Sequence, residues 1–353
     1  MADNATSSVA SKSEVPFRAV NSPGLPDLLE KNGLSLLVST YQAGKLMAVR
    51  AGQGQMWTLL RSFERPMGLA VKDSRQFVLG TRLQIWDFRN APNIARQVEP
   101  VGKHDGCFIP RISCVTGDIL GHEMAWAGDE LWIVNTLFSC LCTLNAEYSF
   151  VPRWKPAFVT ALAPEDRCHL NGLVVVDGQP KYTTALGETD TAEGWRPNKA
   201  SGGVLLDIRS GEVISRGLSM PHSPRVHMDR LWVLEGGTGR LQVVDANTGK
   251  RDTVAELPGF VRGLAFYGPY AFVGLSKIRE TALFGGLPIA ARVDELQCGL
   301  WVIDVTIGET VAFMQFQLGV DEIFGVEVLK EVRFPEILGF QDDQLEKTYV
   351  LPP

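Results

Sequence analysis

Three of the chain's five histidines stand near residues with oxygen-bearing side chains, at the start of short apolar segments. His122 is followed by Glu123, His169 lies two residues before Asn171, and His222 opens the segment His-Ser-Pro-Arg-Val. Imidazole, carboxylate and amide groups can hold a divalent metal ion and leave one position open, which suits hydrolytic or Lewis-acid chemistry. The three segments are therefore candidates for one site, provided that the fold brings them together.

The same residues allow chemistry without a metal ion. His122 or His169 is a candidate general base, with Glu123 orienting its ring. Arg262 and Arg225 are expected to pair with an anionic group of the substrate. The alternative is structural, because polar residues at such positions can also satisfy backbone groups or hold water.

The candidate residues belong to a pattern that recurs along the chain: a polar residue, a small residue, a short apolar strand, a tight turn and a second apolar strand. Six equivalent points are Gly68, Met124, Gly172, Ser223, Gly263 and Gly325. Their spacings are 56, 48, 51, 40 and 62 residues. Repetition of short strands at about 40–50 residues is typical of a β-propeller, so the chain is expected to be an all-β, six-bladed β-propeller.

The two ends of the chain are expected to close the ring. Strands predicted at 34–40, 44–50 and 56–61 lack the polar-start strand that opens the other units, and Phe324–Leu329 supplies a strand of that kind. Such closure removes a free sheet edge. The other blades are predicted at 67–101, 122–153, 169–216, 222–257 and 261–317. The expected organisation is a mobile tail at 1–20, one propeller at 21–340 and a C-terminal tail at 341–353.

Three long insertions are predicted on one face of the ring, called here the upper face, where the first strand of each blade also begins. They span residues 102–120, 187–201 and 275–297. Long loops at one end of a rigid scaffold often carry binding and catalysis. His104, in the first insertion, is therefore expected to contact the substrate.

Composition and charge exclude several classes of partner. A net charge of −6 and an isoelectric point near 5.5 argue against nucleic-acid binding, because neutralising phosphates requires a basic surface. No apolar run has the length of a membrane span, and the N-terminus does not resemble a secretory signal. Cys140 and Cys142 alternate along one strand and are expected in the core, so reduced thiols and a cytoplasmic location are predicted.

Several motifs resemble an uncharacterised bacterial family of conserved hypothetical propeller proteins. They are Leu-Leu-Val-Ser-Thr-Tyr-Gln-Ala-Gly-Lys at 36–45, Cys-His-Leu-Asn-Gly-Leu at 168–173 and Leu-Ser-Met-Pro-His-Ser-Pro-Arg at 218–225. The resemblance covers most of the chain and implies the propeller fold, but no activity.

A second resemblance concerns the site alone. Glu123 before Met-Ala-Trp, Asn171 before Gly-Leu and His222 after Pro221 resemble the metal-binding motifs of six-bladed gluconolactonases of the regucalcin type, where an Asp stands in place of the His. The resemblance implies Glu123, Asn171 and His222 as ligands of one divalent cation. A histidine ligand favours a transition metal over Ca²⁺.

These observations predict a metal-dependent enzyme that acts on a small polar or anionic substrate at the channel mouth, with lactone or ester hydrolysis as the expected reaction. His122 and His169 are its candidate catalytic residues. Two alternatives stay open: a non-catalytic scaffold whose insertions bind a peptide or a partner domain, and an enzyme that tailors a peptide or natural product.

Overall fold

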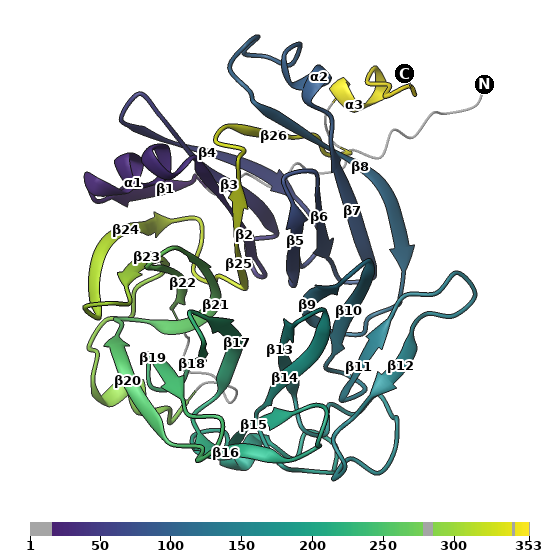
Figure 1. Cartoon of the computed structure of the whole chain (residues 1–353), viewed down its shortest axis with the longest axis vertical. Helices are drawn as coiled ribbons and strands as arrows, with labels where there is room; N and C mark the ends of the chain where they lie inside the picture. The colour runs from purple at the N-terminus through teal and green to yellow at the C-terminus, as the bar shows by residue number, and fades with distance from the viewer. Residues whose placement is uncertain (1–15, 278–284, 341–342, 353) are drawn as a thin grey trace, which may run out of the picture.

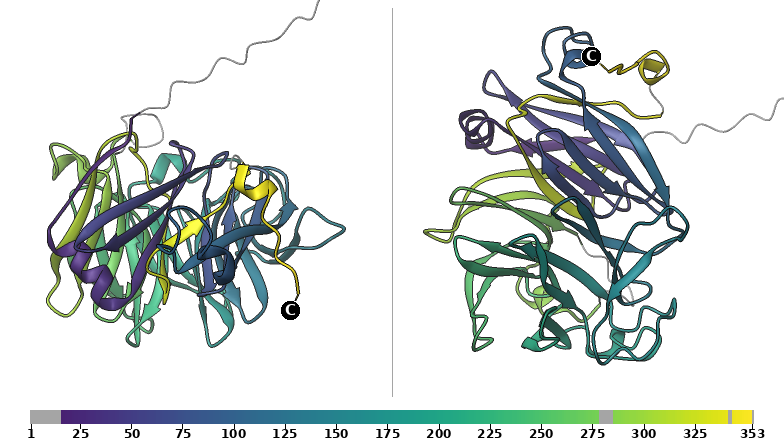
Figure 2. Two further views of the ribbon diagram at one scale, coloured as in Figure 1. Left: turned by 90° about the horizontal axis from the view of Figure 1, so that it is seen from above. Right: turned by 45° about the vertical axis from the view of Figure 1, so that its right-hand side comes forward.

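Six antiparallel sheets stand around a common centre and form a closed ring (Figure 1). The structure is a computed structural model and describes residues 16–277, 285–340 and 343–352. Seen from the side, the ring is a disc whose blades stand next to one another (Figure 2). The expected six-bladed β-propeller is therefore confirmed.

Each blade contains four antiparallel strands that follow one another outward from the centre. Blade one consists of β25 (Gly325–Lys330), β2 (Leu34–Thr40), β3 (Lys45–Gly52) and β4 (Gln55–Ser62). Blade two consists of β5 (Leu69–Asp73), β6 (Gln76–Gly80), β7 (Gln84–Asn90) and β8 (Gly106–Val115). Blade three consists of β9 (Gly121–Ala127), β10 (Glu130–Asn135), β11 (Cys140–Thr143) and β12 (Val151–Trp154).

The second half of the ring repeats this order. Blade four consists of β13 (Leu170–Val176), β14 (Gln179–Ala185), β15 (Gly203–Asp207) and β16 (Val213–Leu218). Blade five consists of β17 (Pro221–His227), β18 (Arg230–Glu235), β19 (Arg240–Val244) and β20 (Arg251–Glu256). Blade six consists of β21 (Phe260–Tyr267), β22 (Tyr270–Ser276), β23 (Gly299–Asp304) and β24 (Glu309–Leu318).

Ring closure occurs where it was predicted. Strand β25 pairs with β2 in antiparallel register, from Leu34 opposite Lys330 to Ser39 opposite Gly325. The chain then continues into β26 (Pro335–Ile337), which adds to β8 as a parallel outer strand. The C-terminal segment thus completes blade one and also covers part of the outer edge of blade two.

Adjacent blades are joined near the centre by a repeated hydrogen bond. A hydroxyl group at the end of a second strand donates to a carbonyl oxygen at the entrance of the next blade. The bonds run from Ser39 Oγ to Met67 O at 2.5 Å, from Thr136 Oγ1 to Leu170 O at 2.5 Å, and from Ser276 Oγ to Ile323 O at 3.2 Å. These bonds fix the starts of neighbouring inner strands relative to one another.

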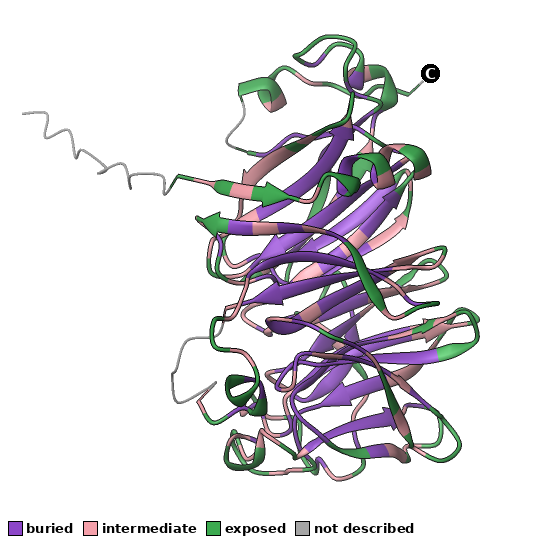
Figure 3. Cartoon of the chain, turned by 90° about the vertical axis from the view of Figure 1, so that its left-hand side faces the viewer, coloured by how far each residue is buried: buried purple, intermediate pink, exposed green. Residues whose placement is uncertain are grey.

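The recurring glycine is explained by the same close approach. A Cβ atom on Gly172 would come within 3.0 Å of Thr184 Oγ1 and of Pro224 in the next blade. Larger side chains line the spaces between blades, where Phe77 and Phe88 stack at 4.6 Å. Figure 3 shows the resulting pattern, with buried residues along the strands and exposed residues in α1 and the loops of the rim.

Helices are few and short within the described ranges. They are α1 (Gly24–Asn32), α2 (Pro92–Ala95), α3 (Asp343–Glu346) and the 3₁₀ turns η1 (Arg196–Asn198) and η2 (Pro288–Ala291). Helix α1 ends at Gly33, whose φ of 65° closes the last turn. Within these ranges, the helices are all too short to cross a membrane.

Two expected boundaries are wrong. Residues 102–120 are not an insertion of the upper face, because β8 occupies Gly106–Val115 and completes blade two. The N-terminal tail is shorter than expected, since Arg18–Asn21 form β1, a fifth strand beside β24. Residues 1–15 of that tail and residues 341, 342 and 353 of the C-terminal tail lie outside the described residues.

Two insertions do lie at the upper face, after the second strands of blades four and six. They contact each other and the strand starts beneath them. Trp195 from the first insertion and Leu287 and Ile289 from the second belong to one buried cluster with Met220 and Phe260. Residues 278–284 of the second insertion lie outside the described residues.

Candidate functional site

A cavity of about 800 Å³ lies at the upper end of the central channel and is called here the upper cavity. Its lining combines charged and aromatic side chains from all six blades and from the insertion of blade four. The residues that matter for its chemistry are His122, His169, His222, Arg262, Phe324 and Trp195. Three of the expected site histidines and one expected arginine are therefore brought together.

Two of the histidines are held in the same way. The Nδ1–H of His122 donates to the carbonyl oxygen of Leu120 at 2.9 Å, and that of His222 donates to Met220 O at 2.8 Å. Leu120 and Met220 have φ values of 49° and 48°, a conformation that is uncommon outside glycine. With Nδ1 as the donor, the Nε2 atom of each ring is left as a hydrogen-bond acceptor.

Burial keeps both of these rings neutral. It lowers the pKa of His122 well below its ordinary value, and the neighbouring His169 and Arg262 lower it further. Burial also lowers the pKa of His222, with a further contribution from the charge of Arg262. At neutral pH, the two rings therefore offer unprotonated nitrogen atoms.

The third histidine differs because it has a carboxylate partner. His169 Nδ1 lies 2.8 Å from Asp166 Oδ2, and the indole N–H of Trp195 donates to the same oxygen at 3.1 Å. Trp195 also contacts the His169 ring, and the His122 ring meets it edge-on with centroids 4.7 Å apart. A histidine oriented by a buried carboxylate is the usual arrangement of a general base.

Arg262 supplies positive charge to the upper cavity. Its guanidinium carbon lies 3.2 Å from the centroid of the Phe324 ring. Burial lowers its pKa to about 10, an effect that Glu322 and Glu123 oppose. The group thus stays charged at neutral pH and contributes to the lining of the cavity.

Glu123 and Asn171 do not line the upper cavity, although both were expected to bind metal. They lie deeper, around an interior cavity of about 20 Å³. One oxygen of Glu123 pairs with Arg225 at 2.5 Å and the other accepts the N–H of Leu173 at 3.0 Å. The side chain of Asn171 donates to Pro221 O at 2.9 Å and accepts from Thr184 Oγ1 at 2.7 Å.

This set does not fit a metal centre. The oxygen atoms that a cation would need already accept hydrogen bonds or pair with a guanidinium. Within the described ranges, no three His, Cys, Asp or Glu side chains are placed to hold a metal ion. We therefore assign no chemical step to a metal ion.

A shift of strand register explains the mismatch. In β9, Gly121 lies opposite Asn135, and in β17, Pro221 lies opposite Glu235, at the ends of the second strands. His122 is therefore the counterpart of His222, whereas taking Met124 and Ser223 as equivalent points, as in the sequence repeat, pairs Glu123 with His222. Both strands carry a register shift just after this point, and a shift of one residue changes the face that a side chain occupies.

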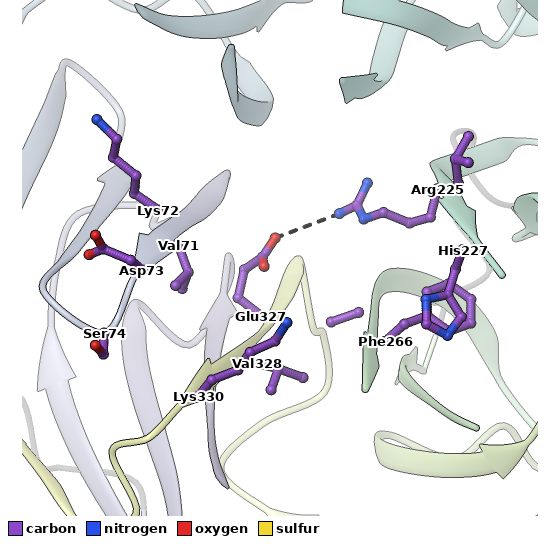
Figure 4. Close-up of a pocket in the computed structure, with 12 residues that line it drawn as sticks. Val71, Lys72, Asp73, Ser74, Arg225, His227, Phe266, Glu327, Val328 and Lys330 are labelled. Carbon is purple, nitrogen blue, oxygen red and sulfur yellow. Dashed lines mark ion pairs between the residues drawn. The ribbon is translucent and has the colours of Figure 1, made fainter. Parts of the chain in front are cut away.

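Arg225 joins the interior cavity to a cavity of about 330 Å³ at the opposite end of the channel, the lower cavity (Figure 4). There, its Nη2 lies 3.7 Å from Glu327. Burial raises the pKa of Glu327 to about 7; Arg225 opposes this shift and Glu123 adds to it. Arg225 thus belongs to a buried ion-pair layer below the upper cavity and does not line that cavity.

The expected position of His104 is wrong. The residue is buried between blades one and two, where its ring contacts Phe334 and its Nε2 lies 3.6 Å from Glu336. His104 comes just before β8, and β8 begins at the lower end of blade two. The residue therefore lies at the opposite end of the blade from the starts of the inner strands. His104 therefore has no contact with the site.

Comparison with known proteins places the chain in a family. A family model described as a domain of unknown function, DUF4915, matches residues 23–338. The chain belongs to the DUF4915 family. The expected membership of an uncharacterised propeller family is thus confirmed, whereas the likeness of the site to gluconolactonases stays a prediction.

Solved structures support the fold of this DUF4915 protein. The crystal structure of a nidogen/laminin complex contains a chain that matches with a TM-score of 0.54 and 12% sequence identity. The match covers 84% of the DUF4915 chain and 99% of the other chain. No curated protein matches in sequence.

Two residues of the DUF4915 site, Asp166 and Trp195, were not anticipated from the sequence. Asp166 lies three residues before His169, and this spacing was the signal available for it. Trp195 lies in the insertion of blade four, in the segment Glu-Gly-Trp-Arg. Nothing in that segment indicates a partner 29 residues away.

Proposed function

We propose that the protein is a metal-independent enzyme that hydrolyses a lactone or ester of a small anionic molecule in the upper cavity. The observation that carries the proposal is the Asp166–His169 pair, with 2.8 Å between carboxylate and Nδ1. It faces a cavity that also presents a buried guanidinium, on Arg262. A base and a cationic group in one cavity suit the hydrolysis of an ester or lactone that carries an anionic group.

The proposed step uses the Nε2 atom of His169. It takes a proton from a water molecule as the water oxygen attacks the carbonyl carbon of the substrate. The bond between the carbonyl carbon and the leaving-group oxygen then breaks, and His169 gives the proton to the leaving-group oxygen. Asp166 stabilises the protonated ring between the two steps, and the neutral Nε2 of His122 helps to orient the water.

Strained backbone at the site supports this proposal. Asp166 and His169 have φ values of 48° and 50°, and Leu120 and Met220 share this conformation. Non-glycine residues in this region cost roughly 1 kcal/mol or more each and are concentrated at functional sites. The strained residues are His169 itself and the three residues whose oxygen atoms contact the Nδ1 atoms of the histidines.

A cytoplasmic location is part of the proposal. All six cysteines are free thiols, and five of them are buried. Unpaired cysteines are typical of a reducing compartment.

The test measures hydrolysis of a panel of aryl esters and lactones by the purified protein after treatment with a chelator. We expect activity that falls at least a hundredfold in His169→Gln and in Asp166→Asn. The matched control is His227→Gln, because His227 stacks on Phe266 at the lower end of the channel. Activity lost on chelation and restored by an added divalent metal ion would contradict the metal-independent mechanism, and binding without turnover would favour the non-catalytic alternative.

A further inference from the structure

Arg262 combines burial with an unused hydrogen-bonding group. Its side chain is only 11% exposed. Its Nη2 has no hydrogen-bond partner among the described residues, and its Nη1 lies 3.8 Å from Glu322, beyond hydrogen-bond distance. Leaving a buried donor without a partner is unfavourable, and more so when the donor is charged. Such a group is expected to have a partner when the site is occupied.

The plane of the guanidinium is fixed by aromatic contacts. One face lies against the Phe324 ring at 3.2 Å. That ring is itself held by Tyr41, which stacks on it at 5.8 Å, and by His122, which meets it edge-on at 5.2 Å. With a face covered, the guanidinium can bind a ligand through the N–H groups at its edge. This is the geometry for two parallel hydrogen bonds to a planar carboxylate.

The remaining wall sets a second requirement. Trp195, Met220 and Phe260 line the upper cavity and belong to one buried apolar cluster. A volume of about 800 Å³ is within the range that holds a drug-sized molecule and is far larger than a carboxylate alone requires. The ligand that fits therefore has an apolar body as well as an anionic end.

Two other arginines at the cavity have closer carboxylate partners than Arg262, and Lys277 follows β22 on the same side of the cavity as Arg262. Arg65 pairs with Asp118 at 3.1 Å, and Arg196 pairs with Glu193 at 2.6 Å. Their charges are largely neutralised by these pairs, so they contribute less to the attraction of an anion than Arg262 does. The anionic end is thus assigned to the side of the cavity formed by blades one and six.

We propose that the substrate is a carboxylic acid with an apolar, aromatic-sized body, and that Arg262 selects it by binding the carboxylate through two hydrogen bonds. This inference rests on the proposed function for its reaction, since the hydrolysed ester or lactone is a second group of the same molecule. The carboxylate end, held by Arg262, directs that second group toward His169.

The experiment compares 4-phenylbutanoate with 4-phenylbutanamide, which has the same shape without the charge. Binding is measured by titration calorimetry to the His169→Gln variant, so that turnover does not interfere. We expect the carboxylate to bind at least tenfold more tightly than the amide. Arg262→Gln should abolish this preference, and Arg262→Lys should restore only part of it, because ammonium lacks the planar pair of donors.

The matched control is Arg65→Gln, which alters another arginine of the cavity lining and should keep the preference. Thermal unfolding reports whether each variant is folded; if Arg262→Gln is not, Arg262→Lys alone carries the comparison. Equal binding of acid and amide, or a preference that survives Arg262→Gln, would overturn the inference, as would binding of neither probe. The two proposals fail separately. Selective carboxylate binding without turnover of any ester would contradict the proposed reaction but keep the substrate class. Turnover of neutral esters that depends on His169, without a preference for carboxylates, would contradict the substrate class but keep the reaction.

Discussion

The indole nitrogen of Trp195 lies 3.1 Å from the carboxylate of Asp166, to which it donates a hydrogen bond. Trp195 belongs to the insertion of blade four, and Asp166 lies before the first strand of that blade. The bond therefore connects the loop that covers the cavity to the residue that orients His169. The insertion has a direct means of controlling the geometry of the proposed base.

Trp195→Phe tests this connection, because it keeps an aromatic ring beside His169 but removes the N–H group together with part of the buried indole. We expect kcat for ester hydrolysis to fall about tenfold with little change in KM, since a less firmly held carboxylate orients the base less well. The free energy of unfolding should fall by more than the roughly 1 kcal/mol of the lost hydrogen bond, because the smaller ring also leaves a cavity in a buried cluster. Enzyme kinetics across pH and denaturant titration measure the two effects.

Trp132→Phe is the control, since its indole N–H bonds to Glu130 on the exposed part of β10. It should leave the kinetics unchanged. If Trp195→Phe changed stability but neither kcat nor its pH profile, the insertion would have a structural role alone.

The buried layer below the cavity predicts a pH dependence of stability. Glu327 has an ordinary pKa of 4.5, and in the folded protein it is raised to about 7. Between these values, the folded chain keeps a proton that the unfolded chain has lost, so the free energy of unfolding falls as pH rises from 4.5 to 7. At about 1.4 kcal/mol per pKa unit, the loss amounts to roughly 3 kcal/mol and is complete above pH 7.

Glu327→Gln removes this titration, so its stability relative to the natural chain should rise with pH across the same interval. Urea denaturation at a series of pH values measures the difference. Glu147→Gln, at an exposed turn residue, should give a difference that is flat with pH. A flat difference for Glu327→Gln as well would show that Glu327 ionises at the same pH in both states.

The tight contact at Gly172 predicts a strong effect of one methyl group. In Gly172→Ala, the new Cβ would meet Thr184 and Pro224, neither of which is the end of a long flexible side chain. We expect a loss of about 1–3 kcal/mol in the free energy of unfolding, measured by denaturant titration. Gly121→Ala is the control, because its new Cβ would have room and its φ is not positive, so the substitution should cost less. Gly178 is unsuitable as a control because its positive φ would add strain of its own.

The fold followed from the sequence because its determinants repeat. The Gly172 position recurs in other inner strands for a steric reason, and Phe324–Leu329 carried the pattern that the first blade lacked. Strand β8 was missed because Pro110 lies within it, and proline argues against a strand in the interior of a sheet. Proline is tolerated there because β8 is the last of the four strands of its blade, and β26 pairs with it only at Gly106–Phe108, short of Pro110.

The site was only partly predictable, for a different physical reason. Topology brings His122, His169 and His222 together, since first strands begin at one end of the ring. The ligand role of Glu123 depended on register, which a shift of one residue alters and which the sequence does not display. Asp166 reaches the site through loop geometry, which no strand periodicity determines.

A buried carboxylate lies where β26 attaches to the ring, and this gives the last prediction. Glu336 in β26 pairs with Arg61 at 2.6 Å and lies 4.0 Å from Arg50 and 3.6 Å from His104. Burial lowers the pKa of Arg50, and Glu336 opposes that effect. In Glu336→Gln, the shape is kept but the buried arginines lose their counter-charge. We expect a loss of about 3 kcal/mol in the free energy of unfolding, because an uncompensated buried charge is costly.

Glu309→Gln, at the exposed start of β24, is the control, and its free energy of unfolding should stay within about 0.5 kcal/mol of that of the natural chain. Equal stability of the two variants would show that hydrogen bonding, and not charge, fastens β26 to the ring.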